Sequence, residues 1–198
     1  MQTAAEAVDL ISPEYQAILR ATHAKQSWGR TGHHFLQEVV TGYQELGCST
    51  LLDYGSGRES LRIAIEYYYP SLVKEMVCYD PGIEDRSALP APADFVVGTD
   101  VLEHVEPHLI DNVLDHMDSL MIKGGFLNIA LTKAKRLLSD GSNAHLIVAG
   151  KYGSYMWLEM LERRSWVVVD YQGSAKRLKV WLRKEVGNAG SKARLLGP

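Results

Sequence analysis

The most informative segment of this chain is Thr50-Leu51-Leu52-Asp53-Tyr54-Gly55-Ser56-Gly57-Arg58-Glu59-Ser60. A short apolar run ends at an acidic residue, and a turn with two glycines follows. Because glycine has no Cβ, the backbone of such a turn can bend sharply and approach a ligand closely. A helical pattern over residues 61–72 comes next. The segment therefore predicts a buried strand, a ligand-binding turn and a helix whose N-terminus can hold an anion.

The same alternation of strand and helix continues on both sides of this segment. Upstream, residues 12–46 are predicted to be helical, with Ser12 as an N-cap and a break near residues 28–32. Downstream, short apolar runs predict strands at 76–79, 95–97, 126–131, 166–171 and 178–182, with helices at 102–121 and 152–164. These patterns predict an α/β fold with a doubly wound, mostly parallel sheet, a C-terminal antiparallel hairpin and an N-terminal helical extension.

The expected organisation has three parts. Residues 1–48 form an N-terminal helical segment that is a candidate lid, and residues 49–184 form a Rossmann-like domain. Residues 185–198 are rich in Gly, Ala, Ser and charge, which predicts a disordered tail.

Composition excludes several classes of protein. The chain has 198 residues, 46% of them hydrophobic, and a net charge of -3, which provides no overall attraction to nucleic acid or an anionic membrane. Its two cysteines, Cys48 and Cys78, adjoin apolar runs and are expected to be buried free thiols. A signal peptide and a membrane-spanning run are both absent from the sequence, so we expect a cytoplasmic protein without a membrane partner.

Two acids distinguish between possible nucleotide cofactors. Asp53 lies two residues before the first glycine, where it would repel a pyrophosphate but suits an ammonium group. The NAD pattern also needs Gly or Ala where Ser60 stands. Asp80 ends the next expected strand, 27 residues after Asp53, where a carboxylate can accept hydrogen bonds from both hydroxyls of a ribose. These positions favour an adenosyl amino acid over a dinucleotide.

The D-x-G-x-G turn at Asp53 and the segment Val101-Leu102-Glu103-His104 together resemble class I S-adenosylmethionine (SAM)-dependent methyltransferases, of the type 11/12-like group. The resemblance covers about residues 49–182 and implies SAM as the cofactor. It implies cofactor-binding roles for Asp53, Gly55 and Gly57 at the methionine part, for Asp80 at the ribose, and for Thr99 and Asp100 near the sulfonium. It also implies that His104 lies one turn into the following helix.

Recognition of the acceptor is predicted in the polar loop over residues 138–147. A loop with Asp140, Asn143 and His145 at this edge of the sheet is typical of substrate binding. His145 is the predicted general base, with Asp100 and His104 as the other catalytic candidates. From the N-terminal segment, His34 is a further candidate for contact with the acceptor.

Some features depart from the family pattern. The family often has glycine at the position of Glu59, and its third strand has no clear counterpart, so Asp85 is only a candidate for the acid that contacts adenine. The functional prediction is a methyltransferase acting on a small-molecule, nucleoside-like or sugar-like acceptor. The alternatives are a catalytically degenerate SAM-fold binding module, a nucleic-acid methyltransferase and a nicotinamide dehydrogenase.

Other charged groups have ordinary explanations. His104 and His108 are spaced as metal ligands on a helix, but no further ligand is evident, so no metal is predicted. Glu103 and His104 could equally fix the local structure. A run of basic residues near the C-terminus is expected to be a solvated sheet edge; its members are Lys176, Arg177, Lys179, Arg183, Lys184, Lys192 and Arg194.

Overall fold

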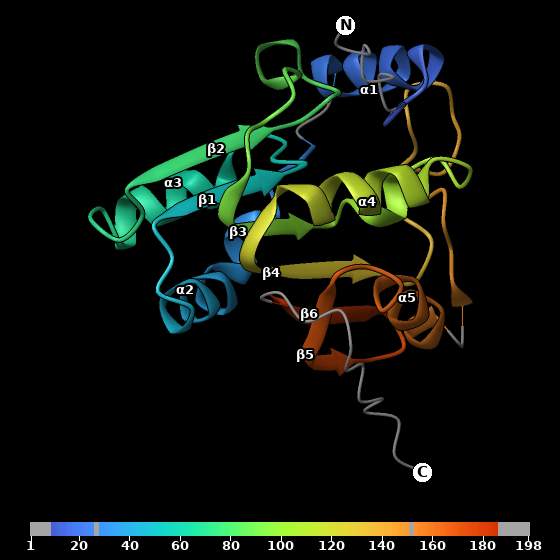
Figure 1. The fold of residues 1–198 in the computed structure, drawn as a ribbon. Coiled ribbons are helices and arrows are strands. Elements are labelled where there is room, and N and C mark those ends of the chain that lie inside the picture. Colours follow the sequence, from blue (N-terminus) through green and yellow to red (C-terminus); the bar gives the residue numbers. More distant parts are fainter. Residues whose placement is uncertain (1–8, 26–27, 151–152, 186–198) are drawn as a thin grey trace, which may run out of the picture.

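A six-stranded sheet runs through the protein in the order β2-β1-β3-β4-β6-β5 (Figure 1). The structure is a computed structural model that describes residues 9–25, 28–150 and 153–185. Its strands are β1 (Thr50–Tyr54), β2 (Glu75–Tyr79), β3 (Ala93–Thr99), β4 (Met121–Ala130), β5 (Trp166–Gly173) and β6 (Arg177–Lys184). Its helices are α1 (Pro13–Lys25), α2 (Leu36–Glu45), α3 (Ser60–Tyr68), α4 (Ile110–Leu120) and α5 (Gly153–Leu161), with short 3-10 helices η1 (Gly32–Phe35), η2 (Glu84–Arg86) and η3 (Leu102–His104).

The strand directions confirm the predicted fold class. Strands β1 to β4 are parallel to their neighbours, whereas β6 pairs antiparallel with both β4 and β5. The terminal hairpin therefore adds one antiparallel strand to the sheet. In Figure 1, the arrows of β1, β3 and β4 all point to the right, so their carboxyl ends form one edge. The loops that leave this edge, together with α1 at the top, surround the candidate site.

Helices cover both faces of the sheet. On one face, the apolar sides of α4 and α5 pack on Leu52, Val96 and Leu127. On the other face, α2 and α3 pack on the alternate residues Leu51 and Phe95. Since successive side chains of a strand point to opposite faces, strands covered on both sides must be apolar throughout. This is why the strands have continuous apolar runs in the sequence.

The missing third strand of the family pattern is confirmed within the described residues. Strand β2 forms an edge of the sheet, and between β2 and β3 the chain has only η2 and loop. The cofactor-binding end of β1 and β2 is unaffected, because β1 still pairs with β2 in parallel from Thr50 to Tyr54.

Two predicted helices differ from the structure, and proline explains both differences. The predicted helix at 102–121 is divided into η3 and α4, and Glu106 directly precedes Pro107 in the segment between them. The predicted helix at 61–72 ends at Tyr68, before Pro70. A residue that precedes proline is disfavoured in the α region. His104 therefore lies in η3 and not one turn into a long helix, so it does not share a helical face with His108.

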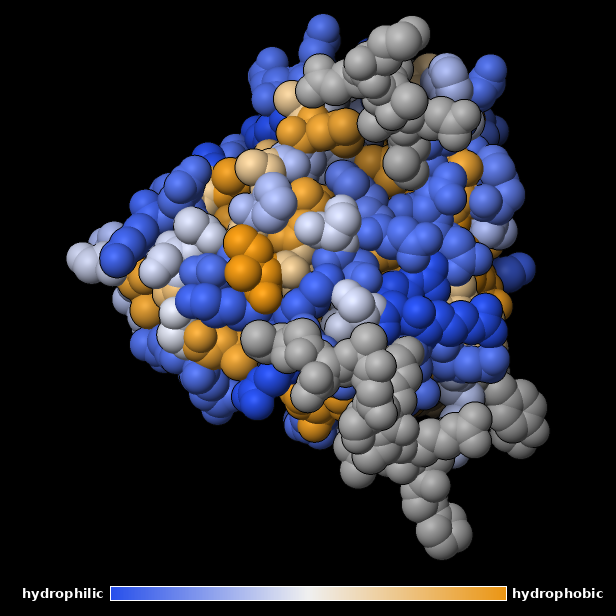
Figure 2. Space-filling view, in the orientation of Figure 1, coloured by the Kyte–Doolittle hydropathy of each residue, from blue (hydrophilic) through white to orange (hydrophobic). Residues whose placement is uncertain are grey.

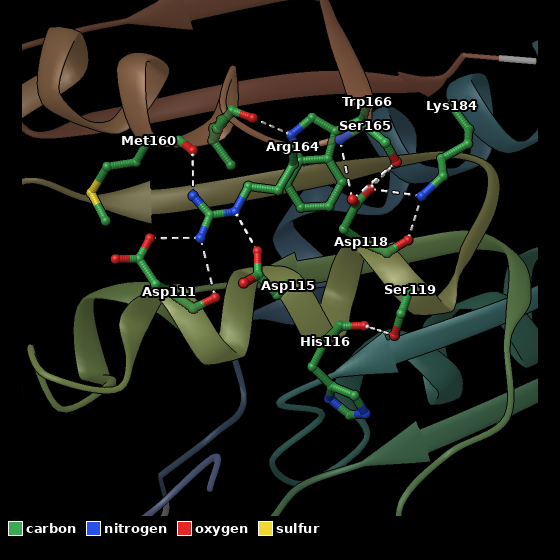
Figure 3. Close-up of polar contacts among 11 residues, drawn as sticks. Asp111, Asp115, His116, Asp118, Ser119, Met160, Arg164, Ser165, Trp166 and Lys184 are labelled. Atoms are coloured by element: carbon green, nitrogen blue, oxygen red, sulfur yellow. Dashed lines mark hydrogen bonds and ion pairs between the residues drawn. The ribbon is translucent and has the colours of Figure 1, made fainter. Parts of the chain in front are cut away.

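A buried arginine joins α4 to the C-terminal part of the chain (Figure 3). The Arg164 guanidinium donates hydrogen bonds to the Asp111 carboxylate (2.6 Å), the Asp115 carboxylate (3.0 Å) and the Met160 carbonyl oxygen (2.8 Å). One turn along α4, Asp118 accepts a hydrogen bond from the Lys184 ammonium (2.7 Å). These contacts fix the hairpin relative to the parallel part of the sheet.

Figure 2 shows hydrophobic side chains in scattered groups among hydrophilic ones on this face of the molecule. Within the described residues, no helix combines the length and the apolar character needed to cross a membrane. The predicted tail lies outside the described residues, except for residue 185.

Candidate active site

Two acidic side chains lie side by side at the carboxyl ends of β1 and β2. Asp53 is 3% exposed and Asp80 is 7% exposed. Asp80 supports the glycine turn, because its Oδ2 accepts a hydrogen bond from the Gly57 N–H (2.9 Å) and its Oδ1 accepts one from the Gly82 N–H (2.9 Å). Each carboxylate oxygen retains a second lone pair. Asp80 can therefore hold the turn and still accept hydrogen bonds from a ligand.

The Asp53 carboxylate lines the larger of two cavities at this edge. Burial and, to a smaller extent, the negative charge of Asp80 raise its pKa to about 7, although the positive charge of Arg62 opposes both effects. Among the described residues, no donor forms a hydrogen bond to this carboxylate. A buried acid without a partner is costly unless a ligand or a proton satisfies it. The site therefore favours a cation beside Asp53.

The two glycines of the turn are required by its geometry. Gly55 has φ +76° and Gly57 has φ +52°. A Cβ at Gly57 would lie 2.6 Å from the Gly29 Cα, because the N-terminal segment packs directly on the turn. The Arg58 N–H donates a hydrogen bond to the Gly29 carbonyl oxygen (2.7 Å). The segment before α2 is thus attached to the predicted cofactor-binding turn.

Glu59 keeps the shape of the turn although it replaces a glycine of the family pattern. Its φ is +57°, in the left-handed region that glycine normally occupies. Its carboxylate forms ion pairs with Arg62 (3.0 Å) and Arg86 (2.8 Å), and the side chain lines neither cavity. The substitution therefore leaves the space above the turn open.

Two adjoining cavities open at the strand ends. The smaller, about 120 Å³, lies between α1 and the ends of β1 and β2, and its lining includes Tyr15, Leu19, Tyr79 and Asp80. The larger, about 620 Å³, extends over the ends of β3 and β4 and the loop after β4. The residues that line both cavities are Trp28, Gly29, Gly55, Asp100 and His104. This arrangement can hold two ligands, or two parts of one ligand, in contact.

Thr99 ends β3, Asp100 follows it directly, and both line the larger cavity. Asp100 has φ +56°, a conformation uncommon for any residue other than glycine. Its carboxylate accepts hydrogen bonds from the Asn128 amide (2.6 Å) and the Arg177 guanidinium (3.3 Å). Asp100 is therefore held rigidly at the boundary between the cavities.

The structure brings His104 and His145 together in the wall of the larger cavity. Their ring centroids are 4.8 Å apart, edge to face. Nδ1 of His104 donates a hydrogen bond to the Ala144 carbonyl oxygen (2.7 Å), and Nδ1 of His145 donates one to the Thr132 carbonyl oxygen. In a neutral ring, the proton on Nδ1 leaves a lone pair on Nε2. Each Nε2 can accept a proton or bind a metal ion.

Glu103 fixes the local structure through one carboxylate oxygen, whereas its other carboxylate oxygen has no hydrogen-bond partner among the described residues. The side chain is fully buried, and Oε1 accepts a hydrogen bond from the Ala130 N–H (2.9 Å). Its backbone carbonyl oxygen accepts hydrogen bonds from the N–H groups of Leu146 and Ile147, which fix the loop after β4. Among the described residues, Oε2 has no hydrogen-bond partner. Burial raises the pKa of this carboxyl group to about 8.

Three predicted acceptor contacts are not brought to either cavity. Asp140 is exposed and accepts hydrogen bonds from the N–H (2.9 Å) and hydroxyl group (2.7 Å) of Ser142. Asn143 uses its amide within the loop, where it bonds the backbone of Ala134 (3.0 and 3.1 Å) and the His145 N–H (3.0 Å). His34 is exposed on η1. Loop position in the sequence did not distinguish side chains that shape the loop from those that face the cavity.

Sequence reasoning also missed residues that line the site. Tyr15 and His23 of α1 line the smaller cavity. Six basic residues line the larger cavity: Arg30, Lys133, Lys135, Arg136, Lys176 and Arg177. The clustering of Lys133, Lys135 and Arg136 after an expected strand end was the signal that could have identified part of this set.

The basic residues near the C-terminus lie in two different environments. Lys179 pairs with Glu38, and Lys184 pairs with Asp118 (2.7 Å), on the body of the sheet. Lys176 and Arg177 instead face the larger cavity. Lys192 and Arg194 lie outside the described residues. The expectation of a solvated edge therefore does not describe the whole run.

The fold is similar to that of several solved methyltransferases. The 1,6-didemethyltoxoflavin-N1-methyltransferase of Burkholderia thailandensis, solved with 1,6-didemethyltoxoflavin and S-adenosylhomocysteine, matches with a TM-score of 0.60 at 17% identity, over 90% of this chain and 92% of its own. The magnesium protoporphyrin IX methyltransferase ChlM of Synechocystis PCC 6803, solved with SAM, matches with a TM-score of 0.58 at 13% identity, over 92% and 100% of the two chains.

A third solved structure extends the similarity. The N-methyltransferase NodS of Bradyrhizobium japonicum WM9, in complex with S-adenosylhomocysteine, matches with a TM-score of 0.54 at 16% identity, over 87% of this chain and 99% of its own. No family model matches the sequence, and no curated protein matches it. At these identities the likeness is one of architecture. The chain has the fold of the class I SAM-dependent methyltransferases.

Proposed function

We propose that the protein transfers a methyl group from SAM to a small-molecule acceptor. The observation that carries this proposal is the pair of buried acids, Asp53 and Asp80, at the ends of adjacent parallel strands on either side of a glycine turn. The cation favoured beside Asp53 corresponds to the ammonium group of the methionine part. Asp80 has lone pairs available for the hydroxyls of a ribose.

The two cavities fit the two ends of this cofactor. The smaller cavity, with Asp80 and Tyr79, suits the adenosyl part, and the larger cavity, with Asp53, suits the methionine part. At about 120 Å³ the smaller cavity is below the 300–1,000 Å³ of most ligand sites, so we expect α1 to shift when the cofactor binds. This shift agrees with the interpretation of the N-terminal segment as a lid.

When bound, SAM supplies an electrophilic methyl group, and the main task of the protein is alignment. The wall shared by both cavities, near Gly55, Asp100 and His104, is where the acceptor can meet the methyl group. Glu59 and the missing third strand favoured a degenerate module. However, Glu59 preserves the turn and the missing strand belongs to the far edge, so neither feature obstructs the site.

The charge of the larger cavity supports an acceptor with a negatively charged group. Six basic residues line this cavity, while the whole chain has a net charge of -3. Arg177 is paired with Asp100 (3.3 Å), whereas no ion pair is found for Lys133, Lys135 or Lys176 within the described part of the chain. A nucleoside-like or sugar-like compound that carries a phosphate or carboxylate fits this lining.

Cofactor binding is tested by calorimetry and thermal melting with SAM, S-adenosylhomocysteine and NAD. We expect SAM or its demethylated product to raise the melting temperature by mass action. Asp80→Asn should weaken binding by about tenfold or more, equivalent to about 1.4 kcal/mol. The matched control is Asp85→Asn, because Asp85 is exposed in η2 and lines neither cavity. A shift with NAD alone, or with none of the three compounds, would contradict the proposal.

The acceptor class is tested by transfer of a labelled methyl group to pairs of phosphorylated and unphosphorylated small molecules. Phosphorylated members should be preferred, and the double substitution Lys133→Ala/Lys135→Ala should raise their KM without changing SAM affinity. Lys179→Ala is the control, because this lysine is paired with Glu38 away from the cavity. Methylation of an oligonucleotide and of no small molecule would favour the nucleic-acid alternative.

A further inference from the structure

Three side chains capable of binding a metal converge in the wall of the larger cavity. Glu103 and His104 come from η3, and His145 comes from the loop after β4, 41 residues later. Each offers one ligand atom, and these atoms all lie within 4.8 Å of one another. A small movement of these side chains would bring all three ligand atoms within bonding distance of a single ion.

Both imidazoles are oriented as metal-binding histidines usually are. In such sites, the nitrogen that does not bind the metal donates its proton to a backbone carbonyl or a carboxylate, which fixes the ring. Here Nδ1 of His104 is bonded to the Ala144 carbonyl oxygen and Nδ1 of His145 to the Thr132 carbonyl oxygen. Neither Nε2 has a hydrogen-bond partner among the described residues. Each of the two neighbouring rings thus has one nitrogen free to bind a metal ion.

Glu103 provides an independent indication of a cation site. Its side chain is 0% exposed, and only one of its two carboxylate oxygens has a partner. A buried polar atom without a partner costs about 1–3 kcal/mol, and more when it is charged. A cation beside the histidines would satisfy this oxygen and offset the cost.

We propose that Glu103, His104 and His145 bind a divalent transition-metal ion. Two imidazoles and one carboxylate suit Zn²⁺, Mn²⁺, Fe²⁺ or Co²⁺, which accept nitrogen and oxygen ligands together. Three protein ligands leave coordination positions open. Because His104 and His145 line the larger cavity, these positions face the space assigned to the acceptor.

The role of the ion rests on the proposed methyltransferase function. An oxygen of the acceptor bound to the metal would be positioned at the wall shared by the two cavities and would lose its proton more readily. His145 would then act as a ligand and not as the general base, since a single Nε2 lone pair cannot do both. Metal binding itself requires no SAM, so it can be tested separately.

The test uses the full, untagged chain after dialysis against a chelator. Co²⁺ is titrated and followed by its visible absorption, and Mn²⁺ and Zn²⁺ are titrated by calorimetry. We expect one ion per chain in the wild type and binding weaker by about 100-fold or more in His145→Ala. Glu103→Gln, checked for folding by circular dichroism, should also weaken binding and change the Co²⁺ spectrum.

The control is His33→Ala, which removes the exposed pair formed by His33 and His34, whose ring centroids are 4.0 Å apart. This variant should bind Co²⁺ as the wild type does. The proposal is overturned if wild-type protein binds none of the three ions, if His145→Ala binds them unchanged, or if His33→Ala abolishes binding. SAM binding without metal binding would refute only the metal site, and metal binding without SAM binding would refute only the proposed function.

Discussion

At Glu59, the free-energy cost of the left-handed backbone can be separated from the stabilisation that the side chain provides. We compare Glu59→Ala, which removes both ion pairs and keeps a Cβ at φ +57°, with Glu59→Gly, which removes the same ion pairs and also relieves the strain. Both variants lose the same polar contacts. The difference between them therefore reports on the backbone.

The magnitudes follow from the geometry. The side chains in the two ion pairs are 23–32% exposed, so each pair should contribute about 0.5 kcal/mol. A left-handed conformation costs a residue with a Cβ about 1–2 kcal/mol, a cost that glycine avoids. Glycine instead loses about 0.5–1 kcal/mol more than alanine on folding, because its unfolded chain has greater conformational freedom. We expect Glu59→Ala to lose about 1 kcal/mol and Glu59→Gly to be close to wild type.

The assay is urea denaturation of the three proteins without cofactor, with equal slopes required for the comparison. A difference of 1 kcal/mol corresponds to roughly 2–4 °C in melting temperature for a chain of this size. SAM should raise the melting temperature of both variants equally, because Glu59 lines neither cavity. If Glu59→Ala is as stable as Glu59→Gly, or more stable, the backbone strain assigned to Glu59 does not exist.

Three further predictions concern the α4 junction and the pH dependence of the site. Arg164→Ala should lower the free energy of unfolding in urea by about 2–3 kcal/mol, because the side chain is only 5% exposed and its acidic partners can be rehydrated. The control Arg163→Ala should cost no more than about 0.5 kcal/mol, since the ion pair of Arg163 is exposed. Equal losses in the two variants would contradict the role assigned to Arg164. The pKa of Asp53 is raised in the folded state to about 7, so folding favours its protonated form. The free energy of unfolding without cofactor should therefore fall as pH rises from about 4 to 7. Asp53→Asn should reduce this dependence, and Glu103, whose pKa is raised to about 8, should account for the rest. Conversely, SAM should bind roughly eightfold more tightly at pH 7.5 than at pH 6, because its ammonium group favours the ionised carboxylate, and calorimetry that shows no dependence on pH would refute the pairing.

The strand pattern and the glycine turn were predictable from the sequence, because both depend on local rules. Runs such as Leu51-Leu52 must be apolar on both faces when helices cover both sides of the sheet. Asp53, Gly55, Gly57 and Asp80 follow strand ends directly, so the topology alone brings them to one edge. Helix boundaries were predicted less well, since periodicity did not give enough weight to the prolines at positions 70 and 107.

The fold class, the position of the turn and the two acids that flank it could be predicted from local sequence, because each depends on residues adjacent along the chain. Which polar side chains face the cavities depends instead on how distant loops pack together. Asp140 and His145 lie five residues apart in one loop, yet only His145 lines a cavity. Likewise, the proximity of His145 to Glu103 and His104 depends on how the loop after β4 bonds the backbone of Glu103, a contact between residues more than 40 positions apart. Spacing along the chain carries no information about such contacts, since they form only when separate loops pack together above the sheet.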